Sequence, residues 1–205
     1  MPMYIVGYID DESDELNDYI KRLSRRDIEL KVAPVGELQQ IKQWIIEEHI
    51  ACMIIDYRLE RKYDFVGTEL FEYLNDELPG LPCIILTSYT ESSASENKVV
   101  QNCIMDRSIM DSDEMDFSTF CDMLKQSTKV FSNNLNKYKQ KFESLYRKKT
   151  DGSITTEEEE ELMSVFRILR SYGEIDDISA ELLTTKISKS IDNVLEKLDK
   201  LLEKN

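Results

Sequence analysis

Hydrophobic residues in the first half of the chain come in short runs separated by amphipathic segments. The runs predict buried strands, and the segments between them, whose apolar residues recur every three or four positions, predict helices. The predicted strands cover residues 4–9, 28–33, 52–56, 82–86 and 103–105. The predicted helices cover residues 14–23, 37–49, a stretch that begins at Gly67, and a weaker stretch at 91–100.

This alternation of strands and helices predicts the fold of residues 1–117. A βαβαβαβαβ order is typical of a parallel sheet covered by helices on both faces. Such α/β sheets bind ligands outside the carboxyl ends of their strands, at the point where the strand order reverses. In a flavodoxin-like, five-stranded sheet of order 2-1-3-4-5, that point lies between the first and third strands.

The second half of the chain, residues 118–205, has a different pattern. After Asp116 the strand pattern stops, and apolar residues recur at helical spacing in three stripes. The stripes begin near Phe120, Leu162 and Leu183. They are separated by a predicted turn at 148–153 and by Gly173, and Thr155 or Thr156 with Glu158 or Glu159 predicts a capping box. Because an apolar stripe needs a partner, we expect an all-α helical bundle or a dimeric coiled coil.

Charge is distributed unevenly between these two halves. The 205 residues carry a net charge of −15, and 41% of them are hydrophobic, enough for a packed core. Residues 1–117 hold 11 basic and 25 acidic residues, a net of −14, whereas residues 118–205 hold 15 and 16, a net of −1. Neither half offers the basic face that nucleic acid requires, so we expect no direct nucleic-acid partner. A divalent cation or a basic protein surface suits the acidic half better.

Several other classes of protein and site lack support in the sequence. No apolar run reaches the ~20 residues of a membrane helix, and no signal peptide is recognisable, which predicts a cytoplasmic protein without membrane contact. The cysteines at positions 52, 83, 103 and 121 lack metal-site spacing and are expected to be buried thiols. His49 is the only histidine, so the helical half cannot be a histidine phosphotransfer domain. There is no glycine-rich phosphate loop.

Polar groups follow three of the predicted strands and form the candidate site. Asp10 and Asp11 follow the first strand, Asp56 ends the third, and Thr87 follows the fourth. With a 2-1-3-4-5 order the three carboxylates would lie side by side, where they repel one another unless a cation is present. A hard, oxygen-preferring ion such as Mg²⁺ is the expected occupant.

These residues and their order resemble the receiver domain of bacterial two-component response regulators, over residues 1–117. The resemblance implies that Asp10 and Asp11 are the acidic pair, Asp56 the phosphoacceptor and Thr87 the switch hydroxyl, with Gly67 opening the third helix. It also implies that Mg²⁺ binds Asp10, Asp11, Asp56 and the backbone carbonyl of Arg58. A carboxylate can act as a nucleophile toward phosphorus, which fits this assignment.

The chain departs from the receiver pattern at the fifth strand. Receivers carry a lysine there, and this chain has Asp106 followed by Arg107. Either Arg107 takes the lysine position, one step along, or Asp106 does and the cation is missing. We favour Arg107, because a cation suits the site and a fourth carboxylate does not. The aromatic residue that many receivers place on this strand is replaced by Cys103 or Ile104, which makes the receiver atypical.

Two functions follow as hypotheses. In the first, the protein is a response regulator and not an enzyme beyond self-catalysed phosphotransfer and dephosphorylation; a histidine kinase or phosphotransfer protein phosphorylates Asp56. Residues 118–205 then act as an effector or dimerisation domain toward a downstream protein. In the second, the chain is a receiver-like interaction scaffold that is never phosphorylated. A DNA-binding regulator would require duplex binding that the charge distribution does not predict.

Overall fold

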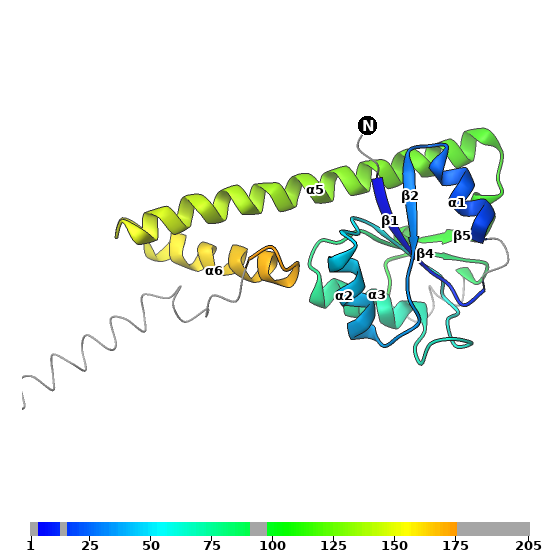
Figure 1. Cartoon of the computed structure of the whole chain (residues 1–205), viewed down its shortest axis with the longest axis horizontal. Helices are drawn as coiled ribbons and strands as arrows, with labels where there is room; N and C mark the ends of the chain where they lie inside the picture. The colour runs from blue at the N-terminus through cyan, green and yellow to red at the C-terminus, as the bar shows by residue number, and fades with distance from the viewer. Residues whose placement is uncertain (1–3, 13–15, 91–97, 176–205) are drawn as a thin grey trace, which may run out of the picture. The chain divides into compact units, whose positions relative to one another are not determined.

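Five parallel strands form the sheet at the centre of the first part of the protein (Figure 1). The structure, a computed structural model, describes residues 4–12, 16–90 and 98–175. The strands are β1 (Tyr4–Ile9), β2 (Ile28–Val32), β3 (Met53–Ile55), β4 (Cys83–Thr87) and β5 (Ile104–Asp106). Their order is β2-β1-β3-β4-β5 and every neighbouring pair is parallel. The predicted flavodoxin-like fold class is confirmed.

Helices connect the strands and continue beyond the sheet. The α-helices are α1 (Leu16–Ser24), α2 (Leu38–Glu47), α3 (Gly67–Glu77), α5 (Glu114–Thr150) and α6 (Thr156–Ser171). Two short 3₁₀ turns, η1 (Gln101–Cys103) and η2 (Arg107–Met110), flank β5. Most of the weak helix predicted at 91–100 lies outside the described residues. Contacts divide the chain into two compact units, Met1–Asn134 and Leu135–Asn205, which are described separately below.

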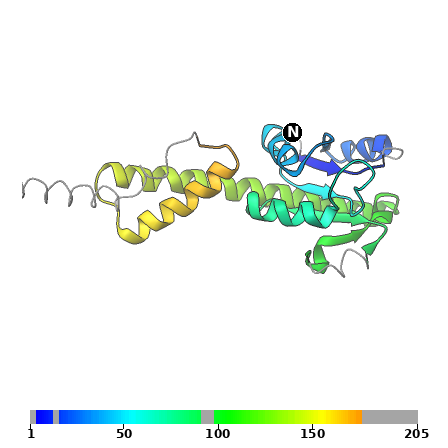
Figure 2. The same ribbon diagram turned by 90° about the horizontal axis from the view of Figure 1, so that it is seen from below.

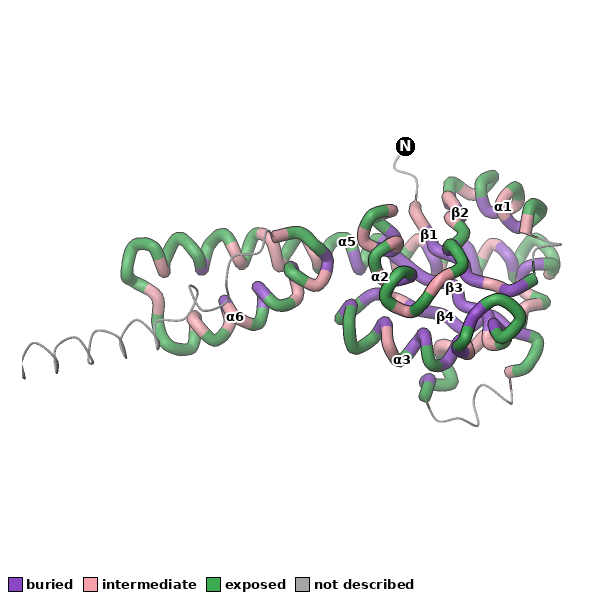
Figure 3. The backbone as a smooth tube through the Cα atoms, turned by 60° about the horizontal axis from the view of Figure 1, so that its bottom comes forward, coloured by how far each residue is buried: buried purple, intermediate pink, exposed green. Residues whose placement is uncertain are grey.

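The core of the first unit lies on both faces of the sheet (Figure 3). One face packs against α1 and the start of α5, where Tyr19, Leu23, Phe117 and Phe120 join the strand residues of one buried cluster. Gly7 faces the other side, since a Cβ added there would meet Trp44 of α2. Strands covered on both faces need apolar side chains in both directions, which explains why β3 and β4 are continuous apolar runs.

The start of α3 lies directly against the strand end that carries Asp56. The Gly67 N–H donates to the carbonyl oxygen of Tyr57 at 2.8 Å, and the Val66 N–H donates to the Glu69 carboxylate at 3.2 Å. A Cβ added at Gly67 would collide with the carbonyl oxygen of Asp56. The absence of a side chain at Gly67 therefore permits the close approach of helix and strand end.

Helix α5 begins earlier than the apolar stripe near Phe120 that predicted it. Asp113 caps its first turn, because its Oδ1 accepts the backbone N–H groups of Met115 at 3.0 Å and Asp116 at 3.1 Å. The helix continues to Thr150, into the stretch predicted as a turn, and the contact division falls inside it, between Asn134 and Leu135. The predicted division into a receiver domain at 1–117 and an effector or dimerisation domain at 118–205 stays a prediction.

In the second unit, the end of α5 pairs with α6 as an antiparallel hairpin (Figure 2). The rings of Phe142 and Phe166 stack with centroids 6.3 Å apart. The predicted capping box is confirmed: the Glu158 N–H donates to Thr155 Oγ1 at 3.2 Å, and the Thr155 N–H donates to Glu158 at 3.1 Å. Gly173, at φ 66°, follows the helix end.

The third predicted helical stripe lies beyond residue 175, outside the described residues. The alternatives of an intrachain bundle and a dimeric coiled coil therefore stay predictions. Among the helices that the structure describes, none is long and apolar enough to cross a membrane.

Candidate functional site

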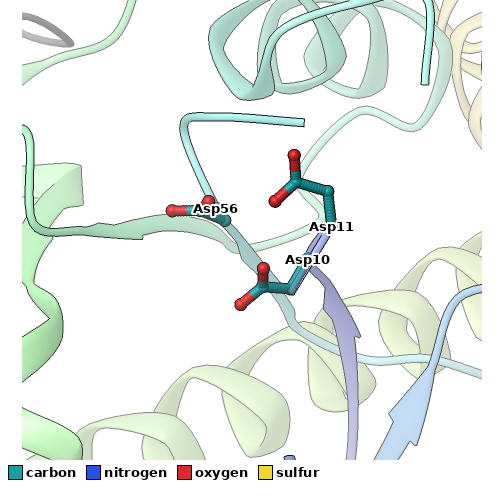
Figure 4. A group of neighbouring side chains, drawn as sticks. All are labelled: Asp10, Asp11 and Asp56. Carbon is teal, nitrogen blue, oxygen red and sulfur yellow. The ribbon is translucent and has the colours of Figure 1, made fainter. Parts of the chain in front are cut away.

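Three carboxylates meet at the carboxyl edge of the sheet. β1 and β3 are neighbours, with Ile9 opposite Ile55, so the residues that follow them emerge together. Asp10, Asp11 and Asp56 each place a carboxylate oxygen within 4.8 Å of the others, and Figure 4 shows the three groups turned toward one shared space. The expectation that the ends of the first and third strands bring these residues together is confirmed.

Asp11 and Asp56 border an open pocket with a volume of about 600 Å³. Residues from the loops after β1, β3, β4 and β5 line it: Asp11, Glu12, Asp56, Tyr57, Arg58, Glu60, Arg61, Thr87, Ser88, Tyr89 and Arg107. Thr87, the predicted switch residue, is fully buried, and its Oγ1 accepts the Tyr89 N–H at 3.2 Å. The pocket thus contains a carboxylate, a hydroxyl and a cation on neighbouring strand ends.

Arg107 provides that cation. Its Nη2 lies 3.0 Å from Asp10 Oδ2 and 2.8 Å from Asp56 Oδ1, so a single nitrogen bridges two of the three carboxylates. Asp106 is exposed, and its Oδ1 accepts the Ser108 N–H at 2.8 Å, which caps η2. Of the two alternatives for the lysine position, only Arg107 contacts the acidic residues in the described part of the chain.

Tyr8 belongs to the site and was not among the predicted residues. Its hydroxyl donates a hydrogen bond to Asp10 Oδ2 at 2.5 Å, and the Glu12 N–H donates to Asp10 Oδ1 at 2.8 Å. Side chains two positions apart on a strand share a face, so a tyrosine two residues before a site aspartate is a signal that sequence reasoning could have used. Both oxygens of Asp10 therefore already accept hydrogen bonds.

Two arginines lie at the rim of the pocket. The Arg61 N–H donates to Asp11 Oδ2 at 3.1 Å, while the Arg61 guanidinium pairs with Glu12. The Arg58 guanidinium stacks over the Tyr89 ring, 3.6 Å from its centroid. Neither guanidinium is paired with Asp10 or Asp56 in the described structure. Of these three arginines, Arg107 is the one whose guanidinium contacts Asp10 and Asp56.

Burial shifts the proton affinity of the central groups. It raises the pKa of Asp56 to about 6, because desolvation and the nearby Asp10 outweigh the opposing charge of Arg107. Burial and Asp10 also raise the pKa of Tyr8 well above its ordinary value, so its hydroxyl remains a protonated donor. The charge of Arg107 and the hydrogen bonds to Asp56 therefore do not fully offset the cost of ionising its carboxylate in the fold.

The chemistry of the donor set fits a hard divalent cation. The cluster contains only carboxylate oxygens, which Mg²⁺ and Ca²⁺ prefer, and no histidine or cysteine. Asp11 and Asp56 are 7% and 6% exposed, so a cation there would be shielded from most of the solvent. Arg58, whose carbonyl the resemblance assigns to the metal, lines the same pocket.

Comparison with known proteins gives fold relatives only. No family profile and no curated protein matches the chain. A CheY-like response regulator receiver domain from Methanospirillum hungatei JF-1 is 20% identical, covering 63% of this chain and 99% of its own, with a TM-score of 0.48. The chain is similar to receiver domains.

Two further solved structures are of the same kind. The BeF₃-activated N-terminal receiver domain of Klebsiella pneumoniae RstA is 14% identical and covers 60% of this chain and 97% of its own, with a TM-score of 0.48. The REC domain of AraT, a response regulator from Geobacillus stearothermophilus, is 12% identical and covers 66% and 98%, with a TM-score of 0.43.

Proposed function

We propose that this protein is a response regulator whose Asp56 accepts a phosphoryl group with the help of Mg²⁺. The observation that carries the proposal is the convergence of Asp10, Asp11 and Asp56 at one strand edge, beside the buried Thr87 and the cation Arg107. These groups come from four neighbouring strand ends: Asp10 and Asp11 follow β1, and Asp56, Thr87 and Arg107 lie at the ends of β3, β4 and β5. Phosphoryl transfer depends mainly on such positioning.

The reaction needs little beyond this placement. An oxygen of the Asp56 carboxylate attacks the phosphorus of a donor, the new O–P bond forms, and the bond to the donor's leaving group breaks, with the electron pair going to that group. Asp56 must be ionised to attack, and with a pKa of about 6 it is predominantly a carboxylate at pH 7. The product is an aspartyl phosphate.

The remaining groups stabilise charge. Asp10, Asp11 and Asp56 would hold Mg²⁺ with the carbonyl of Arg58, and the bound ion would neutralise the negative charge on the phosphoryl oxygens. Arg107 and the Thr87 hydroxyl would donate hydrogen bonds to those oxygens. A charged donor such as arginine makes a particularly strong bond to a phosphoryl group.

The proposal extends to the protein's partners. A histidine kinase or phosphotransfer protein would supply the phosphoryl group, since the described chain has no histidine near the pocket. The helical second unit would pass the change to a downstream protein, with homodimerisation as one route. The chain would not act as an enzyme on a separate substrate, and the cytoplasm is its proposed location.

Intact mass spectrometry tests this function. We expect incubation with acetyl phosphate and Mg²⁺ to add one phosphoryl group to the full chain, and the addition to disappear in Asp56→Asn. Asp64→Asn, an exposed aspartate outside the pocket lining, is the matched control and should still be phosphorylated. Phosphorylation of Asp56→Asn at the wild-type level would refute the assignment of the acceptor.

The receiver-like scaffold is the second candidate, and one observation favours it. Arg107 already pairs with Asp10 and Asp56, so two of the three acidic groups have a counter-ion without metal. If neither acetyl phosphate nor a phosphorylated kinase modifies the wild-type chain in Mg²⁺, the scaffold function replaces the proposal above.

A further inference from the structure

Arg107 and a divalent cation would use two of the same carboxylates. The Nη2 group of Arg107 lies within 3.0 Å of both Asp10 Oδ2 and Asp56 Oδ1, and Asp10 and Asp56 are two of the three carboxylates that could hold a metal. A guanidinium and a divalent cation on the same carboxylates repel each other strongly in a buried site. The two cations therefore compete for the cluster.

Asp10 is held in the position that serves Arg107. Its Oδ2 accepts from the Tyr8 hydroxyl and forms the ion pair with Arg107, and its Oδ1 accepts from the Glu12 N–H. Tyr8 is 2% exposed and its ring packs edge-on against Tyr19, so the hydroxyl is a fixed donor. Because two donor groups already lie on Oδ2, this oxygen binds a metal only by giving up one of those contacts.

The arginine side chain itself is incompletely satisfied. Its Nε is buried and has no hydrogen-bond acceptor within the described residues. A buried donor without an acceptor disfavours this arrangement relative to one in which an acceptor is within reach. The phosphoryl oxygens of a modified Asp56 are such acceptors. Movement of Arg107 toward them would give its Nε the hydrogen bond that it lacks in the present position.

We propose that Arg107 is a tethered counter-ion of the pocket, held on Asp10 by Tyr8, and that a divalent cation has to displace it before Asp56 can react. This inference rests on the proposed function, because it concerns the same metal site. It assigns to Tyr8 and Arg107 a role in setting metal affinity. The protein would bind its metal weakly at rest and release Arg107 toward the phosphoryl group as the metal enters.

Manganese binding tests the proposal without any phosphorylation. Mn²⁺ is a spectroscopic substitute for Mg²⁺, and the electron paramagnetic resonance signal of the free ion gives the dissociation constant for the full chain. Removing a competing charge near two ligands gives an expected tightening of about tenfold in Arg107→Gln. Removing one hydrogen bond to Asp10 gives an expected tightening of about threefold in Tyr8→Phe.

Lys62→Gln is the matched control, because it also removes one positive charge, from an exposed residue that follows the pocket residue Arg61 but does not itself line the pocket. Solvent screens that charge, so its dissociation constant should stay within about twofold of the wild type. Circular dichroism checks that each variant is folded; if Arg107→Gln is not, Tyr8→Phe decides the outcome alone.

The possible outcomes distinguish a failure of the counter-ion role from a failure of the proposed metal site. Wild-type and variant proteins that bind Mn²⁺ with equal affinity would overturn the counter-ion role and leave the metal site intact. Weaker binding by Arg107→Gln would do the same, since it would make Arg107 a helper of metal binding. No Mn²⁺ binding by any form, at any accessible concentration, would overturn both the metal site and the inference.

Discussion

Ion pairs occur in both units of the protein, but their surroundings differ. In the first unit, Arg107 pairs with Asp10 and Asp56, whose side chains are 5% and 8% exposed. In the second unit, Lys148 pairs with Glu158, and these side chains are 47% and 26% exposed. Solvent screens exposed pairs, which contribute about 0–1 kcal/mol each, whereas buried charges pay a desolvation cost that their partner has to offset.

The ion pairs of the helix hairpin and those of the acidic cluster also differ in their balance of charge. In the hairpin, lysines of α5 face glutamates of α6, and the chain's net charge in residues 118–205 is close to zero. At the sheet edge, three carboxylates lie together, and one arginine pairs with two of them, Asp10 and Asp56. An excess of buried negative charge lowers the stability of the fold. It is, however, the arrangement expected of a site that binds a cation.

Breaking the buried pair should have the largest effect. Arg107→Gln is expected to lower the free energy of unfolding by about 3 kcal/mol in metal-free buffer, because it leaves buried carboxylates without their counter-ion. Urea unfolding with a chelator measures it. Added Mg²⁺ should restore part of the loss in the variant and stabilise the wild type less. If the variant is as stable as the wild type without metal, the buried pair contributes no more to stability than an exposed ion pair does.

Removing the Asp56 carboxylate should stabilise the metal-free protein. The pKa of Asp56 is about 6 in the fold, above its ordinary value, so the ionised form is unfavourable there. Asp56→Asn is therefore expected to gain about 2 kcal/mol in free energy of unfolding at pH 7. Urea unfolding measures the gain, with Asp64→Asn as the control that should show none.

The same shift predicts a pH dependence. A carboxyl with a raised pKa binds its proton in the folded state before the unfolded state does, so wild-type stability from this group rises as the pH falls through 6 and the gain is complete below about 4. The advantage of Asp56→Asn should shrink over the same range. An advantage that grows on acidification would contradict the raised pKa.

The capping box of the hairpin should have an intermediate effect. Thr155→Ala removes the acceptor for the Glu158 N–H and is expected to destabilise the second unit by about 1 kcal/mol. Thr156→Ala, at the first helical position, is the control and should cost less. Thermal unfolding followed by circular dichroism compares the two, and equal losses would argue against Thr155 as the cap.

The exposed ion pair should matter least. Lys148→Gln breaks the contact with Glu158 and is expected to change the free energy of unfolding by less than about 0.5 kcal/mol, an effect that high salt removes. The same unfolding measurement checks it. A loss as large as that of Arg107→Gln would erase the distinction between the two kinds of pair.

Much of the first unit was predictable from sequence because its signals are local. Apolar runs marked β1, β3 and β4, and acidic residues after two of them marked the strand edge where Asp10, Asp11 and Asp56 meet. The strand order came from a general preference of α/β folds and from the resemblance to receivers. The capping box at Thr155 was readable because it depends on residues three positions apart.

The remaining features depend on contacts that a linear pattern does not contain. The choice between Asp106 and Arg107 depended on which side chain faces the pocket after a three-residue strand, where a shift of one position reverses the face. The Tyr8 hydroxyl was overlooked because an aromatic residue in an apolar run indicates packing. The early start of α5 depends on Asp113, a capping residue outside the apolar stripe.

The position of Asp56 in the pocket depends on Gly67, a residue that contributes no side chain to the pocket. Because α3 starts against the Asp56 carbonyl with no room for a methyl group, a larger residue at this position fits only if the backbone at Asp56 moves. Substitutions at Gly67 would therefore move the backbone that carries Asp56 from the helix side, while leaving every charged residue of the pocket in place.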